Sequence, residues 1–298
     1  MPLHRATRRV LLAVAGTTVV AGAFTTGAVA GAGSAGQAGE PAQDGRLDEA
    51  ATRIEADALH PVDRDALDAA AIAGMLRAAG DQWGEWRQTP TGPAAGESGQ
   101  VAVSRVPGPG GAATVLTVAS FDRGTGRQVR AALAALPADS SGVVLDLRGN
   151  GGGLLDEAVE TASAFLADGV VVRCTRRDGS VQQFDAVGTG DATTPLAVLV
   201  DGGSASAAEV VAGALAEPGR GVLVGSRTYG KGTVQEPQRL SDGSSLQLTV
   251  ATYTTPSGRS VEGVGLEPDI EVAPGSASGV ALRRAVDVLV GLRADREG

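Results

Sequence analysis

The pattern of apolar and polar positions changes near residue 101. From there on, short apolar runs alternate with segments of helical spacing. The runs with the length and β-branched content of buried strands are 101–106, 113–119, 142–147, 170–174, 196–200, 221–224 and 244–253. The segments that predict helices are 126–136, 155–166, 210–217 and 280–292. Strands that alternate with helices predict an α/β fold whose mostly parallel sheet is covered by helices.

Before residue 101 the pattern is helical. Residues 48–59 and 65–79 carry apolar side chains at helical spacing, so we expect a small N-terminal helical segment over residues 46–87. Trp83 and Trp86 follow the second of these helices. We interpret them as side chains that pack the helical segment on the main body.

The N-terminus has the features of an export signal. Three arginines precede the apolar run 10–24, and Ala-Val-Ala at 28–30 matches the small-x-small pattern of a cleavage site. Residues 1–30 are therefore predicted to be a signal peptide, and the protein to be exported to the cell envelope or the extracellular space. A membrane anchor is the alternative, because an uncleaved apolar segment of about 20 residues can span a bilayer.

Two stretches of small residues, glycine and proline divide the chain further. Residues 31–45 and 88–100 are interpreted as linkers, and residues 101–298 as one large core.

Composition limits the classes of function. The net charge of −9 argues against a nucleic-acid-binding protein, whose surface would be basic. Cys174, the one cysteine, lies in an apolar strand and is expected to be a core residue. A cysteine protease is disfavoured, because His4 and His60 are the only histidines in the sequence.

The stretch 195–235 contains the first candidate chemistry. An apolar strand at 196–200 ends in Asp-Gly-Gly, and Ser204 and Ser206 follow before a helical segment. A serine in such a turn lies near the helix N-terminus, whose free N–H groups can stabilise an oxyanion. The turn is therefore a candidate site for a nucleophile, and helix capping by either serine is the alternative.

Lys231 is the one lysine of the chain, and all other members of the 25 Lys and Arg residues are arginine. Arginine serves most surface roles of lysine, but it does not lose its proton near neutral pH. A single lysine held between Gly230 and Gly232 therefore suggests a site that needs an amine able to become neutral. Chance retention of one lysine in a loop is the alternative.

A second candidate is the sequence Leu-Arg-Gly-Asn-Gly-Gly-Gly at 147–153, between a predicted strand and a predicted helix. Glycines let the backbone approach a ligand and turn its N–H groups toward it. The loop is a candidate oxyanion hole or phosphate cradle, although its spacing fits neither a P-loop nor a dinucleotide fingerprint. A plain tight turn is the alternative.

Three motifs, in this order along the chain, resemble those of the carboxyl-terminal processing (tail-specific) peptidases, serine proteases with a Ser/Lys dyad. LRGNGGG at 147–153 is similar to the family's LRxNPGG loop, GSASAAE at 203–209 to its GSASASE turn, and GKGTVQ at 230–235 to its GKGxxQ loop. The segment 256–272 resembles the sequence that follows the dyad. The resemblance implies a crotonase-like α/β peptidase core over residues 101–298.

The resemblance also implies roles for single residues. Ser206 matches the nucleophile, Lys231 the general base, and Gln235 the residue that orients the amine, while Ser204 lies two positions before the nucleophile. The backbone N–H groups of Gly152 and Ala207 form the implied oxyanion hole. A free lysine has a pKa of about 10.4, and burial would lower it toward the range of a useful base. No cofactor or metal is implied.

Two departures from the family pattern affect the expectation. The family carries a PDZ domain before the core, but the 13 residues 88–100 are far fewer than the ~50 that a domain needs, so we expect it to be absent. Gly151 stands where the family has a proline, which loosens the glycine loop.

The sequence therefore predicts an exported serine endopeptidase that cleaves proteins near their C-termini. Its partners would be protein or peptide substrates, not nucleic acid, and a membrane only if the N-terminal segment stays uncleaved. The alternative is a non-catalytic module that binds peptides or apolar ligands on the same scaffold.

Overall fold

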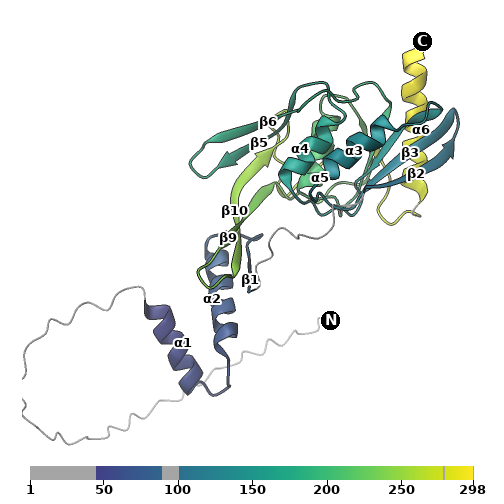
Figure 1. Cartoon of the computed structure of the whole chain (residues 1–298). Helices are drawn as coiled ribbons and strands as arrows, with labels where there is room; N and C mark the ends of the chain where they lie inside the picture. The colour runs from purple at the N-terminus through teal and green to yellow at the C-terminus, as the bar shows by residue number, and fades with distance from the viewer. Residues whose placement is uncertain (1–44, 89–100, 278, 298) are drawn as a thin grey trace, which may run out of the picture.

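The computed structural model describes residues 45–88, 101–277 and 279–297 (Figure 1). The predicted signal peptide lies outside these residues, as do nearly all positions of the two predicted linkers.

A six-stranded sheet forms the centre of the larger part of the molecule. Its strands lie in the order β11 (Ile270–Glu271), β8 (Val222–Gly225), β7 (Leu196–Val200), β4 (Ser140–Asp146), β3 (Gly111–Val118) and β2 (Val101–Gly108). Neighbouring strands are parallel except for β2 and β3, which are antiparallel. The predicted α/β fold with a mostly parallel sheet is therefore confirmed.

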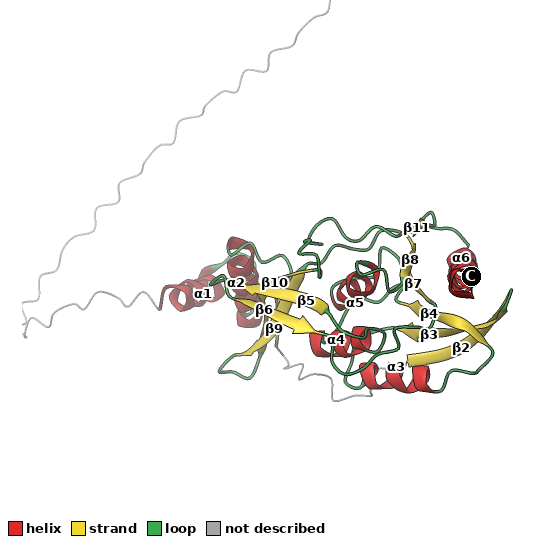
Figure 2. Cartoon of the chain, turned by 90° about the horizontal axis from the view of Figure 1, so that it is seen from above, coloured by secondary structure: helices red, strands yellow, loops and turns green. Residues whose placement is uncertain are grey.

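Helices cover both faces of this sheet (Figure 2). On one face lie α3 (Thr125–Ala134), α4 (Leu155–Ser163) and α5 (Ala207–Ala216), and on the other lies α6 (Gly279–Glu297). In β7, Leu196, Val198 and Val200 join the core beneath α4 and α5, while Ala197 and Leu199 join the core beneath α6. Because both faces are buried, the strands are continuous apolar runs in the sequence.

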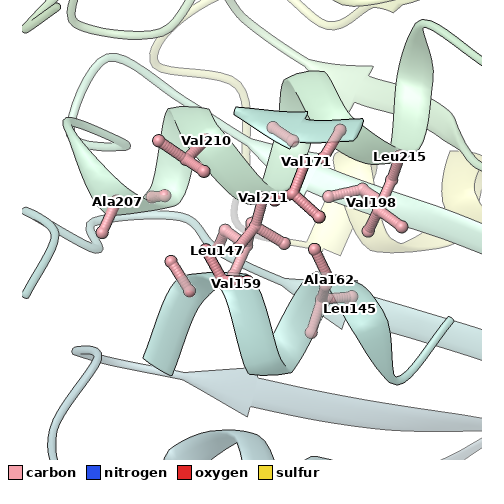
Figure 3. Close-up of a cluster of buried hydrophobic side chains, with 14 of the residues drawn as sticks. Leu145, Leu147, Val159, Ala162, Val171, Val198, Ala207, Val210, Val211 and Leu215 are labelled. Carbon is pink, nitrogen blue, oxygen red and sulfur yellow. The ribbon is translucent and has the colours of Figure 1, made fainter. Parts of the chain in front are cut away.

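The core beneath α4 and α5 is aliphatic (Figure 3). Val211 of α5 and Ala162 of α4 pack with Leu145 and Val198 of the sheet, and all four side chains are fully buried. Full burial of one such aliphatic side chain contributes about 1.5–3 kcal/mol. This packing holds α5 in place, and with it the serine turn at its N-terminus.

A second, antiparallel sheet packs against α4 and α5, and the apolar pattern did not predict it. It has the order β1 (Glu85–Arg87), β10 (Ser245–Thr254), β5 (Val170–Arg176) and β6 (Val181–Asp185), and β9 (Thr233–Arg239) also pairs with β10. The sequence pattern predicts β5 and β10. It does not predict β6 and β9, because β6 is largely exposed and both strands are rich in glutamine and charged residues.

The N-terminal segment consists of α1 (Arg46–Asp57), α2 (Arg64–Ala78) and β1. The two helices were predicted, and the Asp63 side chain caps α2 by accepting from the Ala66 N–H. The predicted small helical segment is therefore present, and the short strand β1, which the sequence pattern did not predict, follows it and pairs with β10 of the main body. The Trp86 indole N–H donates to Ser244 Oγ at 2.9 Å, which confirms the packing role of this side chain.

Within the described residues, no helix combines the length and the apolar composition that a membrane span requires.

Gly225 generates a prediction about stability. It ends β8 with φ 141°, and a Cβ at this position would overlap the carbonyl oxygen of Val200 on the neighbouring strand. Gly225→Ala is expected to lower the free energy of unfolding by about 3 kcal/mol or more. Gly219→Ala is the matched control, since Gly219 also has a positive φ but open space around its Cβ position.

Gly219→Ala should lower the free energy of unfolding by only about 1 kcal/mol, because its one cost is the strain of a left-handed backbone at alanine. Urea denaturation of the two variants measures the difference. Equal losses would contradict the steric argument.

Candidate active site

Ser206 occupies a strained turn between β7 and α5. It is the N-cap of α5, with φ 55° and ψ −116°, and is the one non-glycine residue with positive φ in the part of the chain that the structure describes. Such a conformation costs about 1–3 kcal/mol and persists only where the surroundings determine it. The helix begins at Ala207, three residues before the predicted start, so Ser206 lies directly at the helix N-terminus.

Ser204, the competing serine, has a structural role. It is fully buried, and its Oγ donates to the Leu147 carbonyl at 2.7 Å and accepts from the Asp201 N–H at 3.0 Å. These bonds hold the serine turn against the glycine loop. The Ser206 side chain, by contrast, lines a cavity.

The buried carboxylate of Glu209 connects two segments by hydrogen bonds: the serine turn at 203–209 and the lysine loop at 230–235. Glu209 Oε2 accepts from the N–H groups of Ser206 and Lys231, both at 2.9 Å. Glu209 Oε1 accepts from the Gly230 N–H at 2.9 Å and from the Thr228 hydroxyl at 2.5 Å. Glu209 is fully buried, so these bonds replace its hydration. Glu209 is the last residue of the motif at 203–209 and the one acid in the helix AAEVVAGALA, but the sequence alone predicted no role for it.

Gly152 of the glycine loop lies against Ser206. A Cβ on Gly152, whose φ is 110°, would lie 3.0 Å from the Ser206 Cβ and 3.3 Å from the Ala207 nitrogen, which explains the need for glycine. The Gly152 N–H donates to Asn150 Oδ1 at 2.8 Å. Asn150 is itself fully buried, and its carbonyl accepts from the Ala205 N–H at 2.9 Å. The two loops are thus tied together.

Carboxylates also fix the start of the glycine loop. Arg148 donates to both oxygens of Asp146, at 2.8 and 2.6 Å, and this pairing raises the pKa of Arg148. Asp201 Oδ1 accepts from the N–H groups of Gly149 and Gly203, at 2.8 and 2.9 Å. The glycine loop and the serine turn therefore share one acceptor.

The predicted oxyanion hole stays a prediction. Ala207 is the first residue of α5, and no hydrogen bond between described residues uses its N–H. The Gly152 N–H is engaged by Asn150 and must exchange that partner to bind an oxyanion.

Lys231 is half-buried and lies close to the aromatic ring of Trp83. Its Nζ is 5.0 Å from the ring centroid. Burial lowers the pKa of Lys231 from its ordinary value, while the negative charges of Glu262 and Asp81 oppose the shift. Among the described residues no hydrogen bond joins Lys231 Nζ to Ser206 Oγ.

Gln235 lies on β9, close to the lysine loop, and lines the same cavity as Ser206. Its side-chain amide donates to the hydroxyls of Thr233 and Thr249, at 2.8 and 3.3 Å. The structure thus brings Gln235 and Ser206 to one cavity, and leaves the Lys231 amine outside its walls.

The cavity beside Ser206 has a volume of about 760 Å³ and lies between the starts of α3, α4 and α5 and the strands of the second sheet. Its walls include Cys174, Phe184, Val210 and Tyr253. The Tyr253 hydroxyl donates to the Ser206 carbonyl at 3.0 Å, and burial raises the pKa of Tyr253, so the phenol keeps its proton. Burial raises the pKa of Cys174 to about 11, in agreement with its predicted place in the core.

No group of three or more His, Cys, Asp and Glu residues in 45–88, 101–277 and 279–297 is arranged to hold a metal ion.

A profile described as "Peptidase family S41" matches residues 113–272, just over half of the chain. The matched range includes the strained serine turn and most of the six-stranded sheet. The chain belongs to peptidase family S41, and the predicted resemblance to the carboxyl-terminal processing peptidases is confirmed.

Similar proteins support this assignment. The chain is 48% identical over 141 residues to the carboxy-terminal-processing protease of Bartonella bacilliformis, covering 46% of this chain and 32% of the relative. It is 38% identical over 162 residues to the carboxyl-terminal-processing protease of Synechocystis, covering 54% of this chain and 38% of the relative. The matches therefore span only about a third of the length of these relatives.

Solved structures agree with the fold. The photosystem II D1 C-terminal processing protease is 36% identical with a TM-score of 0.53, covering 64% of this chain and 50% of that chain. A lipoprotein from Streptococcus agalactiae has a TM-score of 0.59 over 82% of this chain and 95% of its own, at 17% identity, which indicates a shared fold alone.

The buried carboxylate of Glu209 generates a second prediction. In Glu209→Gln one acceptor oxygen becomes an amide NH₂ that faces N–H donors, so buried donors lose their partner. The free energy of unfolding is expected to fall by about 2–3 kcal/mol. Chemical denaturation measures the free energy of unfolding. Glu236→Gln is the control, because Glu236 forms a half-exposed ion pair with Arg176 that contributes about 1 kcal/mol at most. If Glu209→Gln lowered the free energy of unfolding no more than Glu236→Gln, the hydrogen bonds of Glu209 would not be what connects the serine turn to the lysine loop.

Proposed function

We propose that this protein is an exported serine endopeptidase that cleaves proteins near their C-termini, with Ser206 as nucleophile and Lys231 as general base. The observation that carries the proposal is the shared acceptor Glu209 Oε2, which holds the main chain of both residues in one arrangement. The printed names of the relatives, carboxy-terminal-processing proteases, support the substrate class.

The proposed reaction starts with a neutral Lys231 amine. Burial favours this form by lowering the pKa of the side chain. The amine accepts the proton of the Ser206 hydroxyl as the oxygen attacks the scissile carbonyl, and it later donates the proton to the leaving amine. Water then hydrolyses the acyl-enzyme by the same route.

The surroundings of Ser206 support the other parts of the mechanism. The Ala207 N–H, at the N-terminus of α5, is available to stabilise the oxyanion, and Gly152 is the proposed second donor. Gln235, which lines the same cavity, is the residue proposed to orient the amine. The lysine side chain has to turn from Trp83 toward Ser206, and catalytic hydrogen bonds often form fully only when the substrate binds.

The cavity supports binding of an extended peptide beside Ser206, because apolar side chains such as Phe184 and Val210 line it together with the polar groups of Gln235 and Ser206. A purely non-catalytic binding module on this scaffold is not favoured, since family S41 is a peptidase family and both dyad residues are intact.

The dyad is tested by substitution. Ser206→Ala and Lys231→Arg are each expected to lower turnover by about 10³-fold or more while the fold is retained, because guanidinium cannot act as a base. Ser204→Ala is the control, and should retain most of the turnover while it costs about 1–3 kcal/mol of stability, because two main-chain groups lose their buried partner. Cleavage of an unfolded protein with an apolar tail, followed by mass spectrometry, measures the rates.

The pH dependence adds a second readout of the dyad. The rate should rise with pH as Lys231 loses its proton, and the rise should occur below the ordinary range of lysine, because burial lowers this pKa. Wild-type activity in Lys231→Arg would contradict the proposal.

Export is proposed from the signal-like residues 1–30. N-terminal sequencing of the protein from its native cell should find a chain that starts at Gly31. Recovery of intact Met1 in the soluble cytoplasmic fraction would contradict export.

A further inference from the structure

Three residues that follow α2 bind residues next to Lys231 and Gln235. The side chains of Gln82 and Trp83 donate to Glu262 Oε1, at 3.0 and 3.3 Å, and Glu262 Oε2 accepts from the Gly232 N–H at 2.5 Å. The carboxylate of Glu262 therefore ties the neighbour of Lys231 to the N-terminal segment. The third residue, Asp81, contacts β10.

Asp81 connects the N-terminal segment to Gln235 through Thr249. It accepts from the Thr249 N–H at 2.8 Å and from the Thr249 hydroxyl at 2.7 Å, and the same hydroxyl oxygen accepts from the Gln235 amide. The N-terminal segment thus supports both Lys231 and Gln235, although neither belongs to it.

The Lys231 amine itself faces an aromatic ring. The distance of 5.0 Å from Nζ to the centroid of the Trp83 ring lies in the range of a cation–π contact. Tyr229 packs edge-on against the same ring, with centroids 5.8 Å apart and an interplanar angle of 61°. Among the described residues, no hydrogen bond uses Lys231 Nζ, so the Trp83 ring is its specific partner.

Lys231 is not among the residues that line the cavity beside Ser206. We propose that Trp83 is a positioning residue for the general base, and that its ring holds the Lys231 ammonium away from Ser206 until substrate binds. The catalytic meaning of this inference rests on the proposed Ser206/Lys231 dyad. The contact between Trp83 and Lys231 does not depend on it.

The charges around the amine determine the direction of the effect. An aromatic face attracts an ammonium ion more strongly than a neutral amine, so Trp83 favours the protonated form. The carboxylates of Glu262 and Asp81 act in the same direction, and Glu209 binds the main-chain N–H of the same residue. The phenol of Tyr229 lies against Trp83. Only burial favours the neutral amine. Loss of the aromatic face should therefore make the base available at lower pH.

The composition of the chain permits a direct test of position. Lys231 is the single lysine, so full-length protein grown with ¹³C-lysine gives one Cε signal. In wild type its protons should be shifted upfield by the ring current of Trp83. Trp83→Leu, which keeps apolar bulk, should abolish the upfield shift and lower the titration midpoint of the amine by about half a pH unit. An unshifted wild-type signal would overturn the proposal.

Two further variants complete the design. Trp86→Leu is the matched control, because Trp86 is the other tryptophan of the segment and bonds Ser244 rather than Lys231. It should leave the lysine signal in place. Trp83→Phe keeps a weaker aromatic face and should give a smaller change of the same sign, which decides the question if Trp83→Leu does not fold.

Kinetics separate positioning from a merely structural role. In Trp83→Leu the acid limb of the pH–rate profile should shift to lower pH by about half a unit. At a fixed pH on that limb, kcat should therefore rise about threefold while KM is unchanged. A fall in kcat with an unmoved pH profile would overturn the proposal. If wild type and Ser206→Ala are equally inactive, the proposed function fails, and the lysine signal still decides the positioning role.

Discussion

The burial of the Glu209 carboxylate is the interaction on which the arrangement of the site depends. An unpaired charge at this position would be strongly destabilising, so four donors, one from the serine turn and three from the segment 228–231, have to converge on it. Their convergence determines the backbone at Ser206, where the strained φ of 55° could not persist in a loose turn. The distance between the main chains of Ser206 and Lys231 is therefore a consequence of one carboxylate group.

The helix that carries this carboxylate lies between the two sheets. One side of α5 packs on the six-stranded sheet and another on β5 of the antiparallel sheet, so both sheets determine the position of its N-terminus. The glycine loop is attached to the same turn through Asn150 and Asp201. The walls of the 760 Å³ cavity come from the starts of α3, α4 and α5 and from the antiparallel sheet, so Ser206 lies where the helix layer meets that sheet.

The sequence predicts the six-stranded sheet well, because β4 and β7 are buried on both faces and form continuous apolar runs. It predicts neither β6 nor β9, whose exposed polar residues follow no apolar period. Ser206, Lys231 and Gln235 are found through motifs of contiguous residues. Glu209 lies in one of these motifs and Trp83 in none, but neither role is predicted, because each depends on contacts with residues 22 and 179 positions away, which no local pattern records.

The pairing of β1 with β10 has a consequence for the order in which the site forms. Trp83 leaves the ribosome early, but its partner Glu262 is separated from it by 179 residues. Domains generally form as their chain is synthesised, N-terminal parts first. Here the early segment has no surface to dock on until β10 and the loop that contains Glu262 have emerged. A nascent chain thus contains the serine and the lysine before Trp83 can bind Glu262, and the site reaches its final arrangement only after the loop that contains Glu262 has been synthesised.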